Sequence, residues 1–189
     1  MIISENLPVL FVTMTHLPLQ ILKEIKRFAP HLKSHIIKKS TPYPLSKDGK
    51  NHPDVLICSY SKLNGWAEHL SGKIKYVIFD EIQELRTGPG SLKYSGAKLI
   101  SEQAVLRMGL SGTPIYGYGH EFFNVIDILR PGILGSRDEF LREWCTFDNK
   151  ISDPNAFGTY LREEGIMLRR TREDVGKERP KVPRIPQYI

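Results

Sequence analysis

The chain has 189 residues, of which 40% are hydrophobic and 25% charged, as in ordinary globular domains large enough to bury a core. A net charge of +6 favours a polyanionic partner, although a solvated lysine-rich surface would explain it equally well. No apolar run approaches the ~20 residues of a membrane helix, the N-terminus lacks the pattern of a secretory signal, and two distant cysteines match no metal spacing, so we expect a reduced intracellular protein without membrane contact.

Strands and helices alternate along the sequence. Short apolar runs predict strands buried on both faces of a parallel sheet, and runs with three- and four-residue spacing predict helices between them. A strand followed by a helix is half of a parallel crossover, so we predict an α/β fold. The predicted strands cover residues 9–13, 35–38, 55–59, 76–80, 104–110 and 167–168, and the predicted helices cover 18–29, 63–70, 91–102, 120–129, 137–144 and 155–164.

Four of these strands end in polar residues that can bind phosphate, metal or water. In open α/β sheets, ligands gather at the carboxyl ends of the strands. Since parallel strands place these ends at one edge, we expect the four polar ends to form one working surface. They are Thr13 with Thr15, Ser59 with Ser61, Asp80 with Glu81, and Ser111 with Thr113.

Asp80 and Glu81 are the candidate catalytic pair. Adjacent carboxylates repel each other by about 1 kcal/mol or more unless a cation or a donor lies nearby. An aspartate that holds Mg²⁺ beside a glutamate that orients a water explains the pair. The alternative is a strand that ends at a solvated turn, and for an isolated Asp-Glu this alternative would be the more common case.

Taken together, these residues resemble the first RecA-like lobe of superfamily-two helicases, and within them the Swi/Snf-type DNA-dependent ATPases. Five segments, over roughly residues 7–182, follow the order and spacing of that family. The resemblance implies a three-layer RecA-like (P-loop NTPase-like) parallel sheet flanked by helices, with a small helical appendage after motif III. The similar segments are 8–16 (motif Ia), 54–63 (motif Ib), 77–83 (the DExx box, motif II), 110–114 (motif III) and 168–175 (motif IV).

The resemblance also implies a role for each matching residue. Asp80 would hold the Mg²⁺ of Mg-ATP, and Glu81 would polarise the attacking water. A second group would couple the nucleotide state to nucleic acid through motif III: Gln83, Ser111, Gly112 and Thr113. A third group would contact a DNA backbone, expected to be double-stranded: Thr15, His16, Ser59, Tyr60, Ser61, Lys62, Arg169 and Arg170. The two arginines would alternatively pair with acids of the same lobe.

Two departures from the family pattern stand out. Gln83 occupies a position where many relatives have histidine, and this form is more similar to phage and bacterial members than to chromatin remodellers. The glycine-rich GxxxxGK[ST] loop that cradles the phosphates occurs nowhere in the sequence. We therefore expect an N-terminally truncated lobe over residues 1–170, with a helical insertion at about 120–165, and an extended linker over 171–189 towards a missing second lobe.

Two functions remain open. The first is a piece of an ATP-dependent DNA translocase that needs a Walker A segment and a second lobe, in cis or in trans, to use ATP and Mg²⁺, and that is inactive alone. The second is a stand-alone nucleic-acid- or protein-binding module that keeps the fold without ATPase activity. A two-metal nuclease is disfavoured because it needs more convergent acids. We expect the cytoplasm of a bacterial or phage-infected cell, or the nucleus of a eukaryote.

Overall fold

The computed structural model describes residues 4–46, 52–113, 118–170, 174 and 176. By its internal contacts the chain divides into two compact units, Met1–Ser152 and Asp153–Ile189. The first unit carries the sheet. Each unit is described by itself.

The first unit is built on a five-stranded sheet with the order β2-β3-β1-β4-β5. All four neighbouring pairs are parallel. The predicted parallel sheet is therefore confirmed, and β1, β3 and β4 have the predicted bounds. The strands are β1 (Val9–Thr13), β2 (Ser34–Ile36), β3 (Val55–Ser59), β4 (Tyr76–Asp80) and β5 (Leu106–Leu110).

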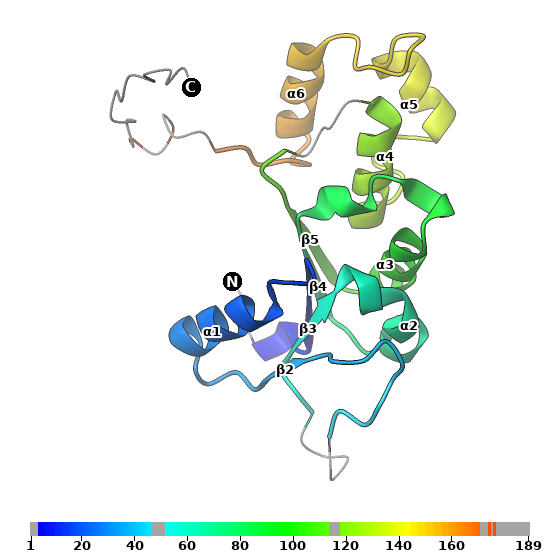
Figure 1. Cartoon of the computed structure of the whole chain (residues 1–189). Helices are drawn as coiled ribbons and strands as arrows, with labels where there is room; N and C mark the ends of the chain where they lie inside the picture. The colour runs from blue at the N-terminus through cyan, green and yellow to red at the C-terminus, as the bar shows by residue number, and fades with distance from the viewer. Residues whose placement is uncertain (1–3, 47–51, 114–117, 171–173, 175, 177–189) are drawn as a thin grey trace, which may run out of the picture. The chain divides into compact units, whose positions relative to one another are not determined.

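Helices cover both faces of this sheet, which gives the predicted three layers. Figure 1 shows α1 on one side of the sheet and α2 and α3 on the other. The polypeptide crosses from strand to strand through these helices, as parallel strands require. The helices of this unit are α1 (Pro18–Phe28), α2 (Tyr60–Leu70), α3 (Leu92–Gln103), α4 (Gly119–Leu129) and α5 (Arg137–Trp144), and short 3-10 turns span Ser4–Asn6, Ile82–Leu85 and Gly88–Gly90.

Alternate residues of the three central strands, β1, β3 and β4, enter different cores. Leu10 and Val12 of β1 join the larger cluster, which includes residues of α2, α3 and α4. Val9 lies in the smaller cluster, against which partly buried residues of α1 pack. The central strands are therefore covered on both faces, which explains why their sequences are almost continuously apolar.

Helix α2 begins at Tyr60, immediately after β3, and not near residue 63 as the sequence predicted. The helix therefore brings its first turn to the carboxyl edge of the sheet. It packs closely on α3 at Gly96, where a Cβ atom would lie only 2.8 Å from the Cα atom of Asn64 in α2. This packing sets the position of the residues that follow Ser59.

The second unit contains α6 (Pro154–Glu163), whose first turn is capped by the side chain of Asp153. The strand predicted at residues 167–168 is wrong. The amides of Ile166 and Met167 instead donate to the carbonyl of Leu161 at 2.9 and 3.1 Å, so this segment closes the end of α6. The predicted linker over 171–189 lies outside the described residues except for positions 174 and 176.

Among the helices of the described residues, none has the length and apolar character needed to cross a membrane.

Candidate functional site

The polar strand ends lie in one row at the carboxyl edge of the sheet. Thr13 is the register partner of Ser59, and Asp80 is the register partner of Leu110. Val12 pairs with Phe79, which places Thr13 beside Asp80. The row therefore runs Ser59, Thr13, Asp80, Leu110, and Ser111 follows Leu110 directly. The sequence-based expectation of one shared edge is confirmed.

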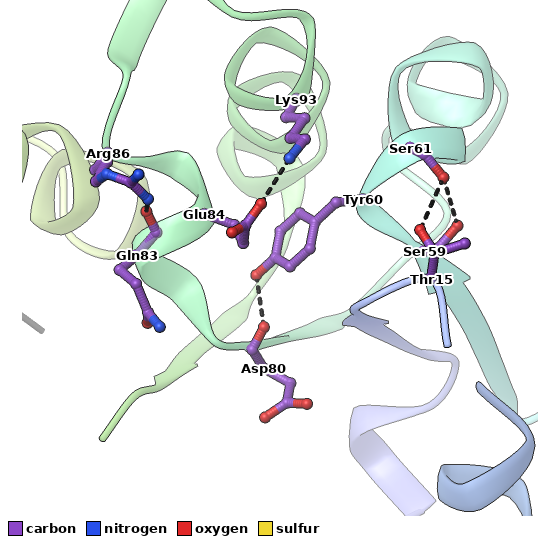
Figure 2. Close-up of polar contacts among 9 residues, drawn as sticks. All are labelled: Thr15, Ser59, Tyr60, Ser61, Asp80, Gln83, Glu84, Arg86 and Lys93. Carbon is purple, nitrogen blue, oxygen red and sulfur yellow. Dashed lines mark hydrogen bonds and ion pairs between the residues drawn. The ribbon is translucent and has the colours of Figure 1, made fainter. Parts of the chain in front are cut away.

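Asp80 is held at two points by neighbouring elements. The Thr13 hydroxyl donates to Asp80 Oδ2 at 2.8 Å. The Tyr60 hydroxyl donates to the main-chain carbonyl of Asp80 at 2.9 Å (Figure 2). Burial, and after it the charge of Asp80, raises the pKa of Tyr60, so its hydroxyl stays protonated and remains a donor. Asp80 itself is only half-buried, so its carboxylate is accessible from the edge.

Glu81 follows in a left-handed backbone conformation, with φ 52° and ψ 53°. Non-glycine residues rarely adopt this conformation, and it turns the chain sharply out of β4 into the Ile82–Leu85 turn. Gln83 Nε2 donates to Glu81 Oε2 at 2.6 Å. The other amide atom, Gln83 Oε1, is buried and has no hydrogen-bond partner among the described residues.

Residues that sequence reasoning missed hold this turn in place. Lys93 Nζ of α3 contacts Glu84 Oε2 at 2.6 Å, as Figure 2 shows. Arg86 Nη1 donates to the carbonyl of Gln83 at 3.2 Å. Asn124 Nδ2 of α4 donates to the carbonyl of Arg86 at 2.8 Å. The signal for these contacts is weak in the sequence, because single polar residues on helices have many possible partners.

A chain of hydroxyl groups lies beside β1 and β3. Ser61 Oγ is 3.4 Å from Thr15 Oγ1 and 3.0 Å from Ser59 Oγ, as drawn in Figure 2. Lys62 Nζ donates to Ser59 Oγ at 3.1 Å. Thr15, His16 and Ser61 are exposed, and Lys62 is partly exposed. These four residues can therefore reach an external phosphate.

Ser59 and Tyr60 differ from the other residues of the predicted nucleic-acid contact, because their side chains are buried; their contact with DNA stays a prediction. Their exposed fractions are 1% and 3%. The Ser59 hydroxyl bonds within the hydroxyl chain, and the Tyr60 hydroxyl bonds to Asp80. The sequence did not reveal this because a polar residue at a strand end looks the same whether its side chain turns outward or inward.

The motif III segment follows β5 at the same edge. Ser111 Oγ accepts a hydrogen bond from the Thr113 amide at 3.0 Å. Gly112 and Thr113 are exposed and Ser111 is partly exposed. Within the described part of the chain, no hydrogen bond joins this segment to Asp80, Glu81 or Gln83, so a coupling role for Ser111, Gly112 and Thr113 stays a prediction.

Arg169 and Arg170 are exposed residues of the second unit. Neither forms a hydrogen bond or ion pair within the described residues. Their predicted contact with DNA, or with acids of the lobe, stays a prediction.

The donor set at the edge suits Mg²⁺ that arrives with a nucleotide. Among the described residues, no group of three His, Cys, Asp or Glu side chains could hold a metal ion. Mg²⁺ is usually bound through one or two carboxylates together with water and substrate phosphates, and Asp80 offers such a carboxylate.

Comparison with known proteins identifies the family. The sequence profile of the SNF2-related domain matches residues 6–188. The chain belongs to the SNF2-related domain family. Its fold is similar to the solved structure of the Sulfolobus solfataricus SWI2/SNF2 ATPase core in complex with dsDNA, with a TM-score of 0.70, 24% identity, and coverage of 92% of this chain and 36% of that one.

Curated relatives extend this likeness to longer proteins. The DNA repair protein rhp54 of Schizosaccharomyces pombe is 36% identical over 91 residues, which are 48% of this chain and 10% of the relative. An ATP-dependent helicase of Mycoplasma pneumoniae is 25% identical over 176 residues, 93% of this chain and 16% of the relative. The SNF2-related chain therefore spans about a tenth to a sixth of the length of these relatives.

Proposed function

We propose that the chain forms the motif Ia to motif IV part of the first lobe of an ATP-driven DNA translocase. The observation that carries this proposal is the single row of Ser59, Thr13, Asp80 and Leu110 at one edge of the sheet. This row places a carboxylate pair beside a group of exposed hydroxyls. A site for phosphoryl transfer and a site for a phosphate backbone would thus share one edge.

For ATP hydrolysis, Asp80 and Glu81 have different roles. Asp80 would hold Mg²⁺, whose charge neutralises the phosphates during transfer. Glu81 would accept a hydrogen bond from the attacking water and orient it. Gln83 fixes one Glu81 oxygen, so the other oxygen is left for the water. The protein would contribute mainly position and charge, as is usual in phosphoryl transfer.

For DNA binding, the exposed side of the hydroxyl chain provides the contacts. Thr15 and Ser61 would donate to phosphate oxygens, Lys62 would supply positive charge, and His16 lies next to Thr15 in the sequence. Such contacts position a protein on the backbone without reading the base sequence. We propose duplex DNA as the partner, and the S. solfataricus relative in complex with dsDNA supports this choice. Arg169 and Arg170 of the second unit would also contact DNA.

The proposed reaction needs parts that the chain does not supply. A Walker A segment would hold the phosphates, and a second lobe would close the ATP site, in cis or in trans. We therefore expect the chain alone to hydrolyse ATP negligibly. The expected compartment is the cytoplasm of a bacterial or phage-infected cell, or the nucleus of a eukaryotic cell.

ATP turnover with and without duplex DNA tests this function. The chain alone should show no DNA-stimulated turnover, and addition of a polypeptide that carries the Walker A segment and the second lobe should produce it. Glu81→Gln should abolish that turnover with little effect on DNA affinity. DNA binding that is unaffected by Asp80→Ala and Glu81→Ala, without turnover in any mixture, would instead support a stand-alone binding module. Turnover by the chain alone that Glu81→Gln abolishes would contradict the predicted dependence on other parts.

A further inference from the structure

We propose that Thr13 is a positioning residue, whose hydroxyl orients the carboxylate of Asp80 for Mg²⁺. The inference rests on the proposed function, in which Asp80 holds the ion. The sequence motifs gave Thr13 no role in orienting Asp80, so this role is an addition to them. Thr13 bonds one carboxylate oxygen, and the other, Oδ1, has no hydrogen-bond partner among the described residues.

The contact itself is short and part-buried, with its donor side inside the core. Thr13 Oγ1 lies 2.8 Å from Asp80 Oδ2, and Thr13 is 0% exposed. A buried hydroxyl strongly prefers to keep a partner, because leaving it unpaired costs free energy. Among the described residues, Asp80 Oδ2 is the acceptor for this hydroxyl, and no hydrogen bond reaches Oδ1. The two carboxylate oxygens therefore have different surroundings.

Both ends of the contact are fixed by the fold. Strand β1 lies between β3 and β4, so the backbone around Thr13 is flanked by ladder hydrogen bonds on both sides. The branched side chain of threonine has few rotamers, which limits where its hydroxyl can point. On the other side, Tyr60 holds the main-chain carbonyl of Asp80 at 2.9 Å. The carboxylate is thus oriented before any ion arrives.

Two simpler roles for Thr13 fit the structure less well. A direct contact with DNA would need exposure, whereas the exposed residues of this segment are Thr15 and His16. A purely structural role would be to satisfy a buried oxygen of Asp80. Asp80 is half-buried, however, so water could hydrate Oδ2 if the Thr13 hydroxyl were absent. What the hydrogen bond adds beyond hydration is orientation.

The expected size of the effect follows from other metal sites. Groups that hydrogen-bond a metal-binding side chain typically change metal affinity or activity by about 10- to 100-fold when they are removed. Thr13→Val keeps the shape and removes the donor. Thr13→Ser keeps the donor and removes the methyl group. Thr13→Val should weaken metal binding, and Thr13→Ser should largely retain it.

Binding of Mn²⁺ alone to the 189-residue chain tests the proposal without a need for turnover. Paramagnetic broadening of the backbone amide signals of Asp80 and Ser111 reports the ion at this edge, and the amide of Lys73 serves as a distant control. Thr13→Val should require about 10-fold more Mn²⁺, or more, for the same broadening. Thr13→Ser should stay within about threefold of the unsubstituted chain, and Asp80→Asn should remove the effect.

The outcomes separate the two proposals. If Asp80→Asn removes the broadening and Thr13→Val leaves it unchanged, Asp80 binds the ion but Thr13 does not position it. If Asp80→Asn leaves the broadening unchanged, the metal role of Asp80 fails and Thr13 loses its role with it. The dispersion of the amide spectrum shows whether each variant is folded, and Thr13→Ala provides the same comparison if valine disturbs β1.

Discussion

Gln83 holds the side chain of Glu81 across the turn that ends β4, through a 2.6 Å hydrogen bond from Nε2 to Oε2. The bond depends on the left-handed backbone of Glu81, which directs Gln83 back towards the preceding carboxylate. A histidine at this position would carry a titratable ring, whereas glutamine is neutral at all pH values. In this chain the orientation of Glu81 is therefore set by a group that does not titrate.

We predict that Gln83→Met lowers DNA-stimulated turnover of the assembled ATPase with little loss of stability. Methionine has a similar length but cannot donate to Glu81, and a misplaced catalytic group can cost about 100-fold in rate. The same change removes the buried, unpaired Oε1, so the free energy of unfolding should change by less than about 1 kcal/mol. Single-turnover kinetics and urea denaturation provide the two measurements. Unchanged turnover would show that Glu81 needs no support from Gln83.

Backbone strain at Glu81 predicts an unusual order of stability. The left-handed conformation costs an L-residue with a Cβ atom roughly 1–2 kcal/mol, and glycine avoids this cost. Glu81→Gly should therefore be more stable to urea than Glu81→Ala by about 1 kcal/mol. Glu68, exposed within α2, is the matched control, because there alanine should be more stable than glycine by about 1 kcal/mol. The same order at both positions would argue against strain at Glu81.

Cys58 predicts a dependence of stability on alkaline pH. Burial raises the pKa of Cys58 to about 12. Because the folded-state pKa is raised, the thiol's contribution to stability is complete below the unfolded pKa of about 8.5, and it is lost as the pH rises through about 12. Between these two pKa values the free energy of unfolding should fall with rising pH. The fall should be steeper for the unsubstituted chain than for Cys58→Ala, by up to about 1.4 kcal/mol per pH unit.

Urea denaturation between pH 8 and pH 11 measures this difference. Cys145→Ala is the control, since Cys145 is only partly buried and should change the slope less. Equal slopes for Cys58→Ala and the unsubstituted chain would mean that the Cys58 thiol is not held neutral by the core.

Charge at the carboxyl edge should govern DNA affinity. Lys62→Ala should weaken binding to duplex DNA. It should also reduce the magnitude of the slope of log K against log[KCl] by about 1, as expected for one lost phosphate contact. Lys73→Ala removes the same charge from the turn before the amino end of β4, away from the carboxyl edge. It should have little effect on DNA affinity. Fluorescence anisotropy at several KCl concentrations measures both variants. Equal effects would indicate binding by net charge alone.

The sheet could be predicted from the sequence because its central strands are short apolar runs bounded by polar residues. The two-residue run at 167–168 misled the prediction, since such a short run carries no periodicity and its amides bond to α6 instead. The burial of Ser59 and Tyr60 could not be predicted, because it depends on where α2 begins. The contact between Gln83 and Glu81 depends on a backbone turn that local sequence does not specify.

Mapping of duplex DNA on the chain by backbone amide chemical shifts tests the central claim most directly. That claim is that four parallel strands bring a nucleotide site and a DNA site to one edge of the sheet. We predict that shifts cluster at residues 13–16, 59–62 and 110–113, while Lys73 and Val105, at the amino ends of β4 and β5, stay unchanged. Shifts that cluster at those amino ends, and spare Thr15 and Ser61, would contradict the account.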